Sequence, residues 1–328
     1  DRSDPLVSRN VVEAAYNNPR SAEGFRRAAA SFSPDIVHFY HLQRLSGSVI
    51  DVCRGTKTPV VFTATDYWVV CPLHQLYLPD GTHCPGPETP PANCLKHMGQ
   101  VSSSQVLKKT MSMVPNALLK TLMRGLDKTN RPFGKPFDAV RALADRKDYL
   151  LGRLEYVARV MVATQFMGEM LAEWGVDSSK IVNLPFAVAG KGKASVSRPI
   201  NPAGEALQIG YVGTLYNYKG AHVLLGAVQK IPKEMPIVFN IYGDENQFPA
   251  YVEALRAMAG DDRRIQFCGT FPPERIGEVL GALDVLVMPS LWHENTPLVI
   301  HEALGAGLPV VGSDVSGVKQ IIRHGVNG

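Results

Sequence analysis

The sequence PSLWHENTPLVIHEALGAGLPVVG, residues 289–312, decides the fold class. An apolar run ends at Met288, a polar loop follows, and a helix is expected to begin at Thr296 and Pro297. Threonine suits the N-cap because its hydroxyl accepts an orphan backbone hydrogen bond, and proline suits the first helical position because it has no N–H to lose. The helix should end at Gly305, since Pro309 cannot continue it and a second apolar run follows. This order of strand, loop, helix and strand predicts one βαβ unit of a parallel sheet.

Short runs rich in Val, Ile and Phe alternate with helical patterns along the rest of the chain as well. This alternation predicts an α/β fold built on parallel sheets. Four strands are expected in the first half of the chain and five in the second. Those strands are residues 36–40, 60–63, 160–163, 181–184, 208–212, 237–242, 264–267, 285–288 and 310–312.

A length of 328 residues is enough for two domains that each bury a core. Residues 189–206 are rich in Gly, Ser, Lys and Pro and lack apolar periodicity, so they are expected to link the domains. We predict one domain over residues 1–202 and another over residues 203–328. The first has fewer strands than a complete doubly wound domain, and the second stops in mid-pattern. Both are expected to be truncated at their outer ends, the alternative being two small domains.

The composition is that of a globular protein, with 45% hydrophobic and 20% charged residues. No apolar run is long enough to span a bilayer, and the first residues lack the basic start and apolar stretch of a secretory signal. Five cysteines in a chain of this size do not form the dense framework of a small secreted domain. We therefore expect a cytoplasmic protein.

The loop and helix start at residues 294–298 carry the most informative chemistry. The first amides of a helix have no acceptor in the helix, and such helix starts bind phosphate, so Leu298 and Val299 are expected to face an anion. Glu294 and Glu302 are eight residues apart, so they would reach different parts of one ligand. A carboxylate accepts hydrogen bonds from two hydroxyls at once, as in a ribose or another sugar ring. The alternative for Glu302 is a solvated helix glutamate.

The same two glutamates, followed by Ala and then Gly-Leu-Pro-Val-Val, resemble the motif of retaining glycosyltransferases of family 4. Three further segments agree with that family in the expected order. They are PDIVHFYHLQRLSG with TPVVFTATDYWVVCP in the first half, GYVGTLYNYKGAHVLLGA at residues 210–227, and QFCGTFPPERIGEVLGALDVLVMP at residues 266–289. The resemblance covers most of the chain from about Ser33 onward and implies a GT-B fold, with two Rossmann-like domains facing across a cleft.

The resemblance implies transfer of a sugar, with retained configuration, from a nucleoside diphosphate sugar to a hydroxyl acceptor. The donor is expected to be a UDP or GDP sugar, and the acceptor a glycan or lipid-linked glycan in polysaccharide or glycolipid assembly. Glu302 would hold the ribose, Glu294 the transferred sugar, and Lys219 the diphosphate, with no metal ion or other cofactor needed for catalysis. The complete donor site would comprise Gly213, Thr214, Lys219, Glu294, Asn295, Thr296, Pro297, Leu298 and Glu302.

Two positions depart from the family pattern. Thr214 stands where the family usually has an arginine, and Thr65 stands where a histidine commonly precedes the aspartate of the first domain. Asp66 is a candidate catalytic or acceptor-binding residue, although an aspartate at a strand end is often only a helix cap. Two alternatives to a transferase therefore stay open. One is a catalytically silent nucleotide-sugar-binding protein, and the other is a nucleotide-sugar epimerase of the same fold.

Cys71, Cys84, Cys94 and His97 have the spacing C-x12-C-x9-C-x2-H in a loop rich in Pro and Gly. Three thiolates and an imidazole make a closed tetrahedral zinc site, and the C-x2-H spacing suits one. The first spacing is loose, so a chance cluster of free thiols competes equally with a structural zinc site. No carboxylate or open coordination position points to a catalytic metal.

Between Lys96 and Lys147 there are eleven Lys or Arg against three Asp. Within this stretch Leu118, Leu119, Leu122, Met123 and Leu126 recur at helical spacing, with basic residues on another face. Residues 106–135 could therefore bind an anionic membrane surface from the cytoplasmic side, the alternative being ordinary core packing. Nucleic acid is not an expected partner, because no aromatic residues are interleaved with these charges and the net charge is only +4.

Overall fold

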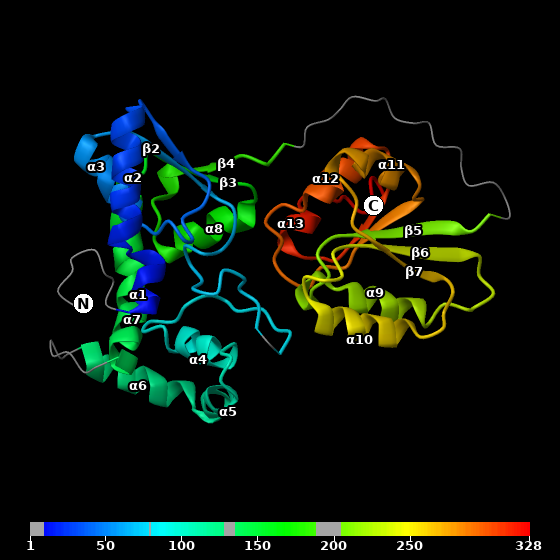
Figure 1. Ribbon diagram of the computed structural model, residues 1–328, viewed down its shortest axis with the longest axis horizontal. Helices are drawn as coiled ribbons and strands as arrows, with labels where there is room; N and C mark the ends of the chain where they lie inside the picture. The colour runs from blue at the N-terminus through cyan, green and yellow to red at the C-terminus, as the bar shows by residue number, and fades with distance from the viewer. Residues whose placement is uncertain (1–9, 79, 128–134, 188–204) are drawn as a thin grey trace. The chain divides into compact units, whose positions relative to one another are not determined.

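The computed structural model describes residues 10–78, 80–127, 135–187 and 205–328. They form two compact units, residues 1–184 and 185–328, each with its own parallel sheet (Figure 1). The predicted boundary at Pro202 and most of the expected linker lie outside the described residues. All nine predicted strands are present, and their ends shift by at most two residues. The prediction of an α/β fold is confirmed.

The first unit contains a sheet of four parallel strands in the order β1-β2-β3-β4. These strands are β1 (Val37–Phe39), β2 (Val60–Ala64), β3 (Arg159–Val162) and β4 (Ile181–Asn183). Most of β2 is buried, which explains why it reads as a continuous apolar run rather than an alternating one. The helices associated with this sheet are α1 (Val11–Tyr16), α2 (Pro19–Phe32), α3 (Ser48–Thr56), α7 (Lys135–Leu154) and α8 (Gln165–Trp174).

Three more helices of the first unit lie between β2 and α7 in the sequence: α4 (Ala92–Gln100), α5 (Gln105–Met113) and α6 (Asn116–Asp127). In Figure 1 they gather near the start of α7, away from the sheet. They pack around a small core of Ala92, Leu119 and Met123. The long loop from β2 to α4 is therefore fixed at both ends by packed elements, and it carries Cys71 and Cys84, whereas Cys94 lies on α4.

The second unit contains five parallel strands in the order β7-β6-β5-β8-β9. They are β5 (Leu207–Val212), β6 (Ile237–Tyr242), β7 (Ile265–Gly269), β8 (Val285–Met288) and β9 (Val310–Gly312). The order reverses between β5 and β8, as in doubly wound sheets, whose ligands bind outside the carboxyl ends of the strands at that switch point. Helices α9 (Ala221–Val228) and α10 (Pro249–Ala259) belong to one core. Helices α11 (Ile276–Gly281), α12 (Leu298–Gly305) and α13 (Ser316–Lys319) belong to the other.

The predicted start of the helix after β8 is wrong by one residue. Helix α12 begins at Leu298, and Pro297 is its cap with an extended ψ of 95°, so Pro297 is not the first helical residue. Thr296 does not cap the helix, because its hydroxyl donates to the carbonyl oxygen of Asn295 at 2.7 Å. The hydroxyl is satisfied within the loop, so the first turn keeps its amides without a side-chain acceptor.

Candidate functional site

Two loops meet at the switch point of the second unit. One follows β5 and ends in the 3₁₀ turn Asn217–Lys219, and the other follows β8 and leads into α12. Strands β5 and β8 are direct neighbours, with Gly210 opposite Leu286. Because both loops leave the same end of adjacent parallel strands, residues about 75 positions apart in the sequence come into contact there.

Gly220 holds the first loop close against the second. Its φ is +77°, a conformation that side chains disfavour, and a Cβ at this position would lie 1.8 Å from the carbonyl oxygen of Pro289. Two residues beyond Pro289, the amide of Leu291 donates to the carbonyl oxygen of Tyr218 at 2.8 Å. The backbone of one loop therefore rests directly on the backbone of the other, and this contact fixes the position of Lys219.

The side chains of Lys219 and Glu294 form a buried ion pair between these loops. Nζ lies 2.7 Å from Oε1, and the two side chains are 19% and 4% exposed. The hydroxyl of Ser290 donates to the same Oε1 at 2.7 Å. A carboxylate this deeply buried is stable only when it is paired and hydrogen-bonded, and here both conditions hold. The structure thus brings Lys219 and Glu294 together, and among the described contacts the second oxygen, Oε2, has no protein donor.

The backbone of Glu294 is held from a second direction. A Cβ on Gly317 would lie 2.0 Å from the carbonyl oxygen of Glu294, so α13 packs tightly against the loop. Asn295 is also buried, whereas Leu298 at the start of α12 is exposed. The amides of Leu298 and Val299 belong to the first turn of α12, where the helix provides no acceptor. These amides lie about one turn before Glu302 on the same helix.

The remaining predicted donor residues occupy the same end of the sheet without joining the ion pair. Glu302 lies on α12 and is half-buried, and no contact with Lys219 or Glu294 is recorded for it in the described part of the chain. The amide of Gly213 donates to the carbonyl oxygen of Tyr242 at 3.1 Å. The carbonyl of Thr214 accepts from the hydroxyl of Tyr211 at 2.8 Å. The backbone of the turn is therefore fixed, and the Thr214 side chain is half-buried.

Three residues of this site escaped the sequence analysis as functional positions. Ser290 is fully buried and is the second donor to Glu294. The ring of Trp292 lies 4.9 Å from Lys219 Nζ and 4.9 Å from the ring of Tyr218. Burial is the main cause that raises the pKa of Tyr218, and the charge of Glu294 adds to it. A small polar residue directly after a buried strand was the available signal for Ser290, but its partner could not be read from spacing.

Asp66, the candidate in the first unit, follows β2 and makes two kinds of contact. Its Oδ1 accepts from the amide of Trp68 at 2.9 Å, and its Oδ2 lies 3.7 Å from His41 Nε2. Burial lowers the pKa of the neighbouring His74 although the charge of Asp66 opposes this. The suggestion that Asp66 caps a helix is wrong, because a turn rather than a helix follows it. His41 was not singled out, although it lies in one of the segments that carry the family resemblance.

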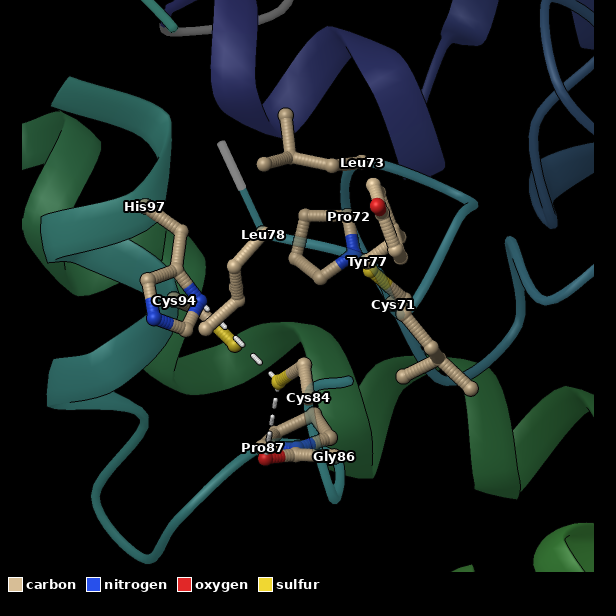
Figure 2. A pocket seen from close by; sticks show the side chains of 11 residues that line it. Cys71, Pro72, Leu73, Tyr77, Leu78, Cys84, Gly86, Pro87, Cys94 and His97 are labelled. Carbon is tan, nitrogen blue, oxygen red and sulfur yellow. Dashed lines mark hydrogen bonds between the residues drawn. The ribbon is translucent and has the colours of Figure 1, made fainter. Parts of the chain in front are cut away.

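The four residues of the suggested zinc site line one cavity of the first unit, which Figure 2 shows from close by. Cys71, Cys84 and Cys94 are buried, and His97 Nδ1 lies 4.0 Å from Cys84 Sγ. Within the described residues, no group of three or more His, Cys, Asp or Glu side chains is placed so that it could hold a metal ion as it stands. The side chains therefore converge without surrounding a common centre.

The apolar stripe of α6 divides between two environments. Leu119 and Met123 are buried in the small core with Ala92, as expected if the stripe serves core packing. Leu118 and Leu122 are exposed. The side chain of Leu126 lies outside the described part of this helix. None of the helices that the structure describes is long and apolar enough to cross a membrane.

Comparisons with known proteins identify a family match for the second unit. Residues 206–328 match the family model of glycosyl transferases group 1. A D-inositol 3-phosphate glycosyltransferase of Corynebacterium urealyticum is 35% identical over 128 residues, which are 37% of this chain and 30% of the relative. Spore coat protein SA of Bacillus subtilis is 33% identical over 126 residues, 36% of this chain and 33% of the relative. The matched region spans about a third of each curated relative.

Solved structures resemble a larger part of the chain. The Anabaena protein Alr3699/HepE in complex with UDP and glucose superposes with a TM-score of 0.57 at 17% identity, over 95% of this chain and 67% of that one. A glycosyltransferase from Rickettsia africae gives a TM-score of 0.59 at 15% identity, over 97% of this chain and 66% of that one. At this identity the likeness concerns the fold, which is that of GT-B glycosyltransferases. The second unit, over residues 206–328, thus matches the glycosyl transferases group 1 family.

Proposed function

We propose that this protein transfers a sugar from a nucleoside diphosphate sugar to a hydroxyl acceptor with retention of configuration. The observation that carries the proposal is the buried pair of Lys219 and Glu294 at the switch point, next to the start of α12. A cation, a carboxylate and free amides gathered at the carboxyl ends of parallel strands suit a ligand with both a diphosphate and hydroxyl groups.

Each half of the ion pair has a role in this proposal. The diphosphate leaves as an anion, so Lys219 and the amides of Asn295, Thr296 and Leu298 would stabilise the charge that grows on it in the transition state. Glu294 neutralises Lys219 before the donor arrives, and its Oε2 is the oxygen that would accept hydrogen bonds from the transferred sugar. Ser290 keeps Glu294 in the required orientation, because its hydroxyl already occupies Oε1.

Glu302 is the proposed ribose ligand, and Gly213 with Thr214 would border the diphosphate. No metal ion is required for the leaving group in this scheme, since Lys219 and the helix start supply the positive potential. The solved HepE complexes contain UDP or UDP-glucose, which favours a UDP sugar as the donor over a GDP sugar. We place Asp66, with His41 beside it, on the acceptor side, where the acceptor would be a glycan or a lipid-linked glycan in polysaccharide or glycolipid assembly.

The variant Glu302→Gln tests the donor site. It keeps the size of the side chain but removes the charge that holds two hydroxyls, so UDP-sugar binding should weaken by at least tenfold in calorimetric titration. Glu253→Gln, an exposed change on α10, is the matched control and should bind as the unchanged protein does. Unchanged donor affinity in Glu302→Gln, with circular dichroism showing an intact fold, rejects the assignment.

Thr214 and Thr65 favour one alternative, a nucleotide-sugar-binding protein without turnover, because both replace family side chains at the two sites. The same titration, followed by an assay for free UDP with and without glycan acceptors, separates the alternatives. Binding without UDP release supports the silent protein. Conversion of the donor sugar without UDP release supports an epimerase.

We also propose that the exposed face of α5 and α6 binds an anionic membrane on the cytoplasmic side. Val106, Met113 and Leu118 are 77%, 74% and 61% exposed, and Lys108 and Lys109 follow the first of them. Apolar side chains that insert at the interface, together with lysines that face lipid phosphates, are the features of a peripheral lipid-binding helix.

Sedimentation with vesicles tests this second proposal. The double variant Val106→Ser, Met113→Ser should bind phosphatidylglycerol vesicles several-fold more weakly than the unchanged protein. Phe32→Ser is the matched control, since Phe32 is 82% exposed at the end of α2. Equal binding of all three proteins, or equal binding to uncharged phosphatidylcholine vesicles, rejects the membrane surface.

A further inference from the structure

The loop between β2 and α4 brings four potential metal ligands to one cavity of the first unit. Cys71, Cys84, Cys94 and His97 all line it, although they span 27 positions of the sequence (Figure 2). The cavity has a volume of ≈ 10 Å³, which is room for one water-sized sphere. The sequence spacing alone did not show whether Cys71 lies near the other three residues. In the fold it lines the same cavity as they do.

One pair of ligand atoms lies near the separation that a tetrahedral site requires. With Zn–S and Zn–N bonds of roughly 2.3 and 2.0 Å, the sulfur and nitrogen of one site lie about 3.6 Å apart. Cys84 Sγ and His97 Nδ1 are 4.0 Å apart. Cys94 and His97 are three residues apart on α4 and therefore lie on one face of that helix. Since no group of three or more described side chains is placed to hold a metal ion as it stands, the four side chains would have to turn toward a common point to close the site.

The charge of the surroundings points to anionic sulfur. Arg146 on α7 is buried, and its guanidinium donates to the backbone carbonyls of Trp68, Val69 and Val70. No carboxylate of the described residues forms an ion pair with it, and the groups whose negative charge would favour its charged form are the thiols of Cys71 and Cys94 and the phenol of Tyr16. A buried cation without a counter-charge is costly.

A zinc ion held by three thiolates and a neutral imidazole carries a net charge of −1, since two positive charges meet three negative ones. Arg146 beside Cys71 and Cys94 balances that charge, whereas three neutral thiols would leave the arginine uncompensated. A disulfide would be equally neutral and would also leave the charge of Arg146 uncompensated. The buried arginine therefore distinguishes a metal-thiolate site from a chance cluster of thiols.

We propose that Cys71, Cys84, Cys94 and His97 bind one structural Zn²⁺, with Arg146 as the balancing cation. Binding would release the three thiol protons, and the four protein ligands would fill the tetrahedral shell and leave no position for substrate. The ion would fasten the loop that begins directly after Asp66 to α4. This proposal is independent of the donor site, which lies in the other unit.

Metal analysis of the unchanged protein, purified with a reductant and without chelators, tests it first. Mass spectrometry of the elements should give one zinc per chain. Exchange into Co²⁺ should produce the intense visible bands of tetrahedral cobalt with thiolate ligands. Both readouts use the folded protein and do not depend on the folding of any variant. Protein with neither zinc nor a cobalt spectrum, or with a disulfide among these cysteines, overturns the proposal.

Variants identify the ligands. Cys84→Ser and His97→Gln should lower the zinc content from one equivalent toward background. Cys268→Ser is the matched control, because this half-buried thiol lies in the second unit on β7 and should leave the zinc content unchanged. Loss of zinc from Cys268→Ser but not from Cys84→Ser would show that the metal is held elsewhere.

Discussion

The two loops at the donor site and the loop that carries the cysteines are held in place in different ways. The donor loops are short and follow β5 and β8, their backbones touch at Gly220, and α13 packs on the second loop at Gly317. The described part of residues 65–91, by contrast, contains no helix or strand beyond a single bridge between Tyr77 and His83. Polar side chains hold it instead, mainly Arg146 and Asn93.

This difference indicates what each loop can tolerate. Where one backbone packs directly on another, a side chain in place of a contact glycine would push the two loops apart. The position of Lys219 therefore depends on residue 220 having no side chain. Where side chains bridge to carbonyl oxygens, the sensitive positions are those bridging residues, and their removal leaves buried acceptors without donors. The following experiments test that contrast, from the largest expected effect to the smallest.

Gly220→Ala should have the largest effect. The new Cβ would lie 1.8 Å from a backbone oxygen at a residue with φ +77°, so the loops must separate. We expect the second unit to lose about 4 kcal/mol of unfolding free energy and to lose donor binding. Thermal unfolding and titration with UDP would measure both. Gly226→Ala on α9 is the control: nothing lies within 4 Å of its Cβ position, so stability should rise by about 0.5–1 kcal/mol. Normal stability of Gly220→Ala would contradict the contact.

Arg146→Met should destabilise the first unit by about 3 kcal/mol, because it leaves three buried carbonyls and the proposed anionic cluster without their cation. Denaturant unfolding followed by the fluorescence of Trp68, whose ring faces Arg146, would measure this. Arg159→Met, an exposed change on β3, is the control. A loss equal to that of the control would mean that the arginine does not hold the loop.

Asn93→Ala should cost about 2 kcal/mol, less than the loss of the arginine. The side chain of Asn93 donates to the carbonyl of Gly86 at 2.8 Å and accepts from the amide of Glu88 at 3.0 Å, so it bridges the loop to α4. Hydrogen exchange at the Glu88 amide should accelerate while exchange in β5 stays constant. Unaltered protection of Glu88 would show that this bridge is dispensable.

The pH dependence of the second unit should show the smallest effect. Burial lowers the pKa of His222 from its ordinary 6.5. The folded state therefore binds fewer protons than the unfolded state, and stability is greatest above pH 6.5 and falls as the pH decreases toward the lower folded pKa. Hydrogen exchange in α9 at several pH values would report this. His222→Gln should flatten the profile and His324→Gln, an exposed change, should not. A profile that His222→Gln leaves unchanged contradicts this cause.

Much of the fold was predictable because its signals are local. The runs that became β6, β8 and β9 matched their predicted bounds, since a buried parallel strand is apolar along its whole length. The start of α12 was predicted one residue early, because Thr296 and Pro297 have the composition of a helix start but the loop satisfies the hydroxyl of Thr296 with Asn295. Residue propensity indicates which local structures a residue favours, and contacts with neighbouring residues decide which of them forms.

The candidate site was predicted only in part. Lys219 and Glu294 were named from motif resemblance, but their 2.7 Å contact and the buried hydroxyl of Ser290 between loop and carboxylate come from strands that are distant in sequence. Likewise, the stripe on α6 could not be divided in advance into buried Leu119 and exposed Leu118, because helical periodicity does not say which of two adjacent faces a neighbour covers.

The residues alone were sufficient to establish strands, helices and the motifs at their ends, because apolar periodicity and turn chemistry act over a few neighbouring positions. Only the folded chain could show that Cys71 and Cys94 line one cavity, or that Gly220 lies against Pro289. Such contacts depend on how strands and helices distant in sequence pack together, and that arrangement is set by burying the two cores as a whole.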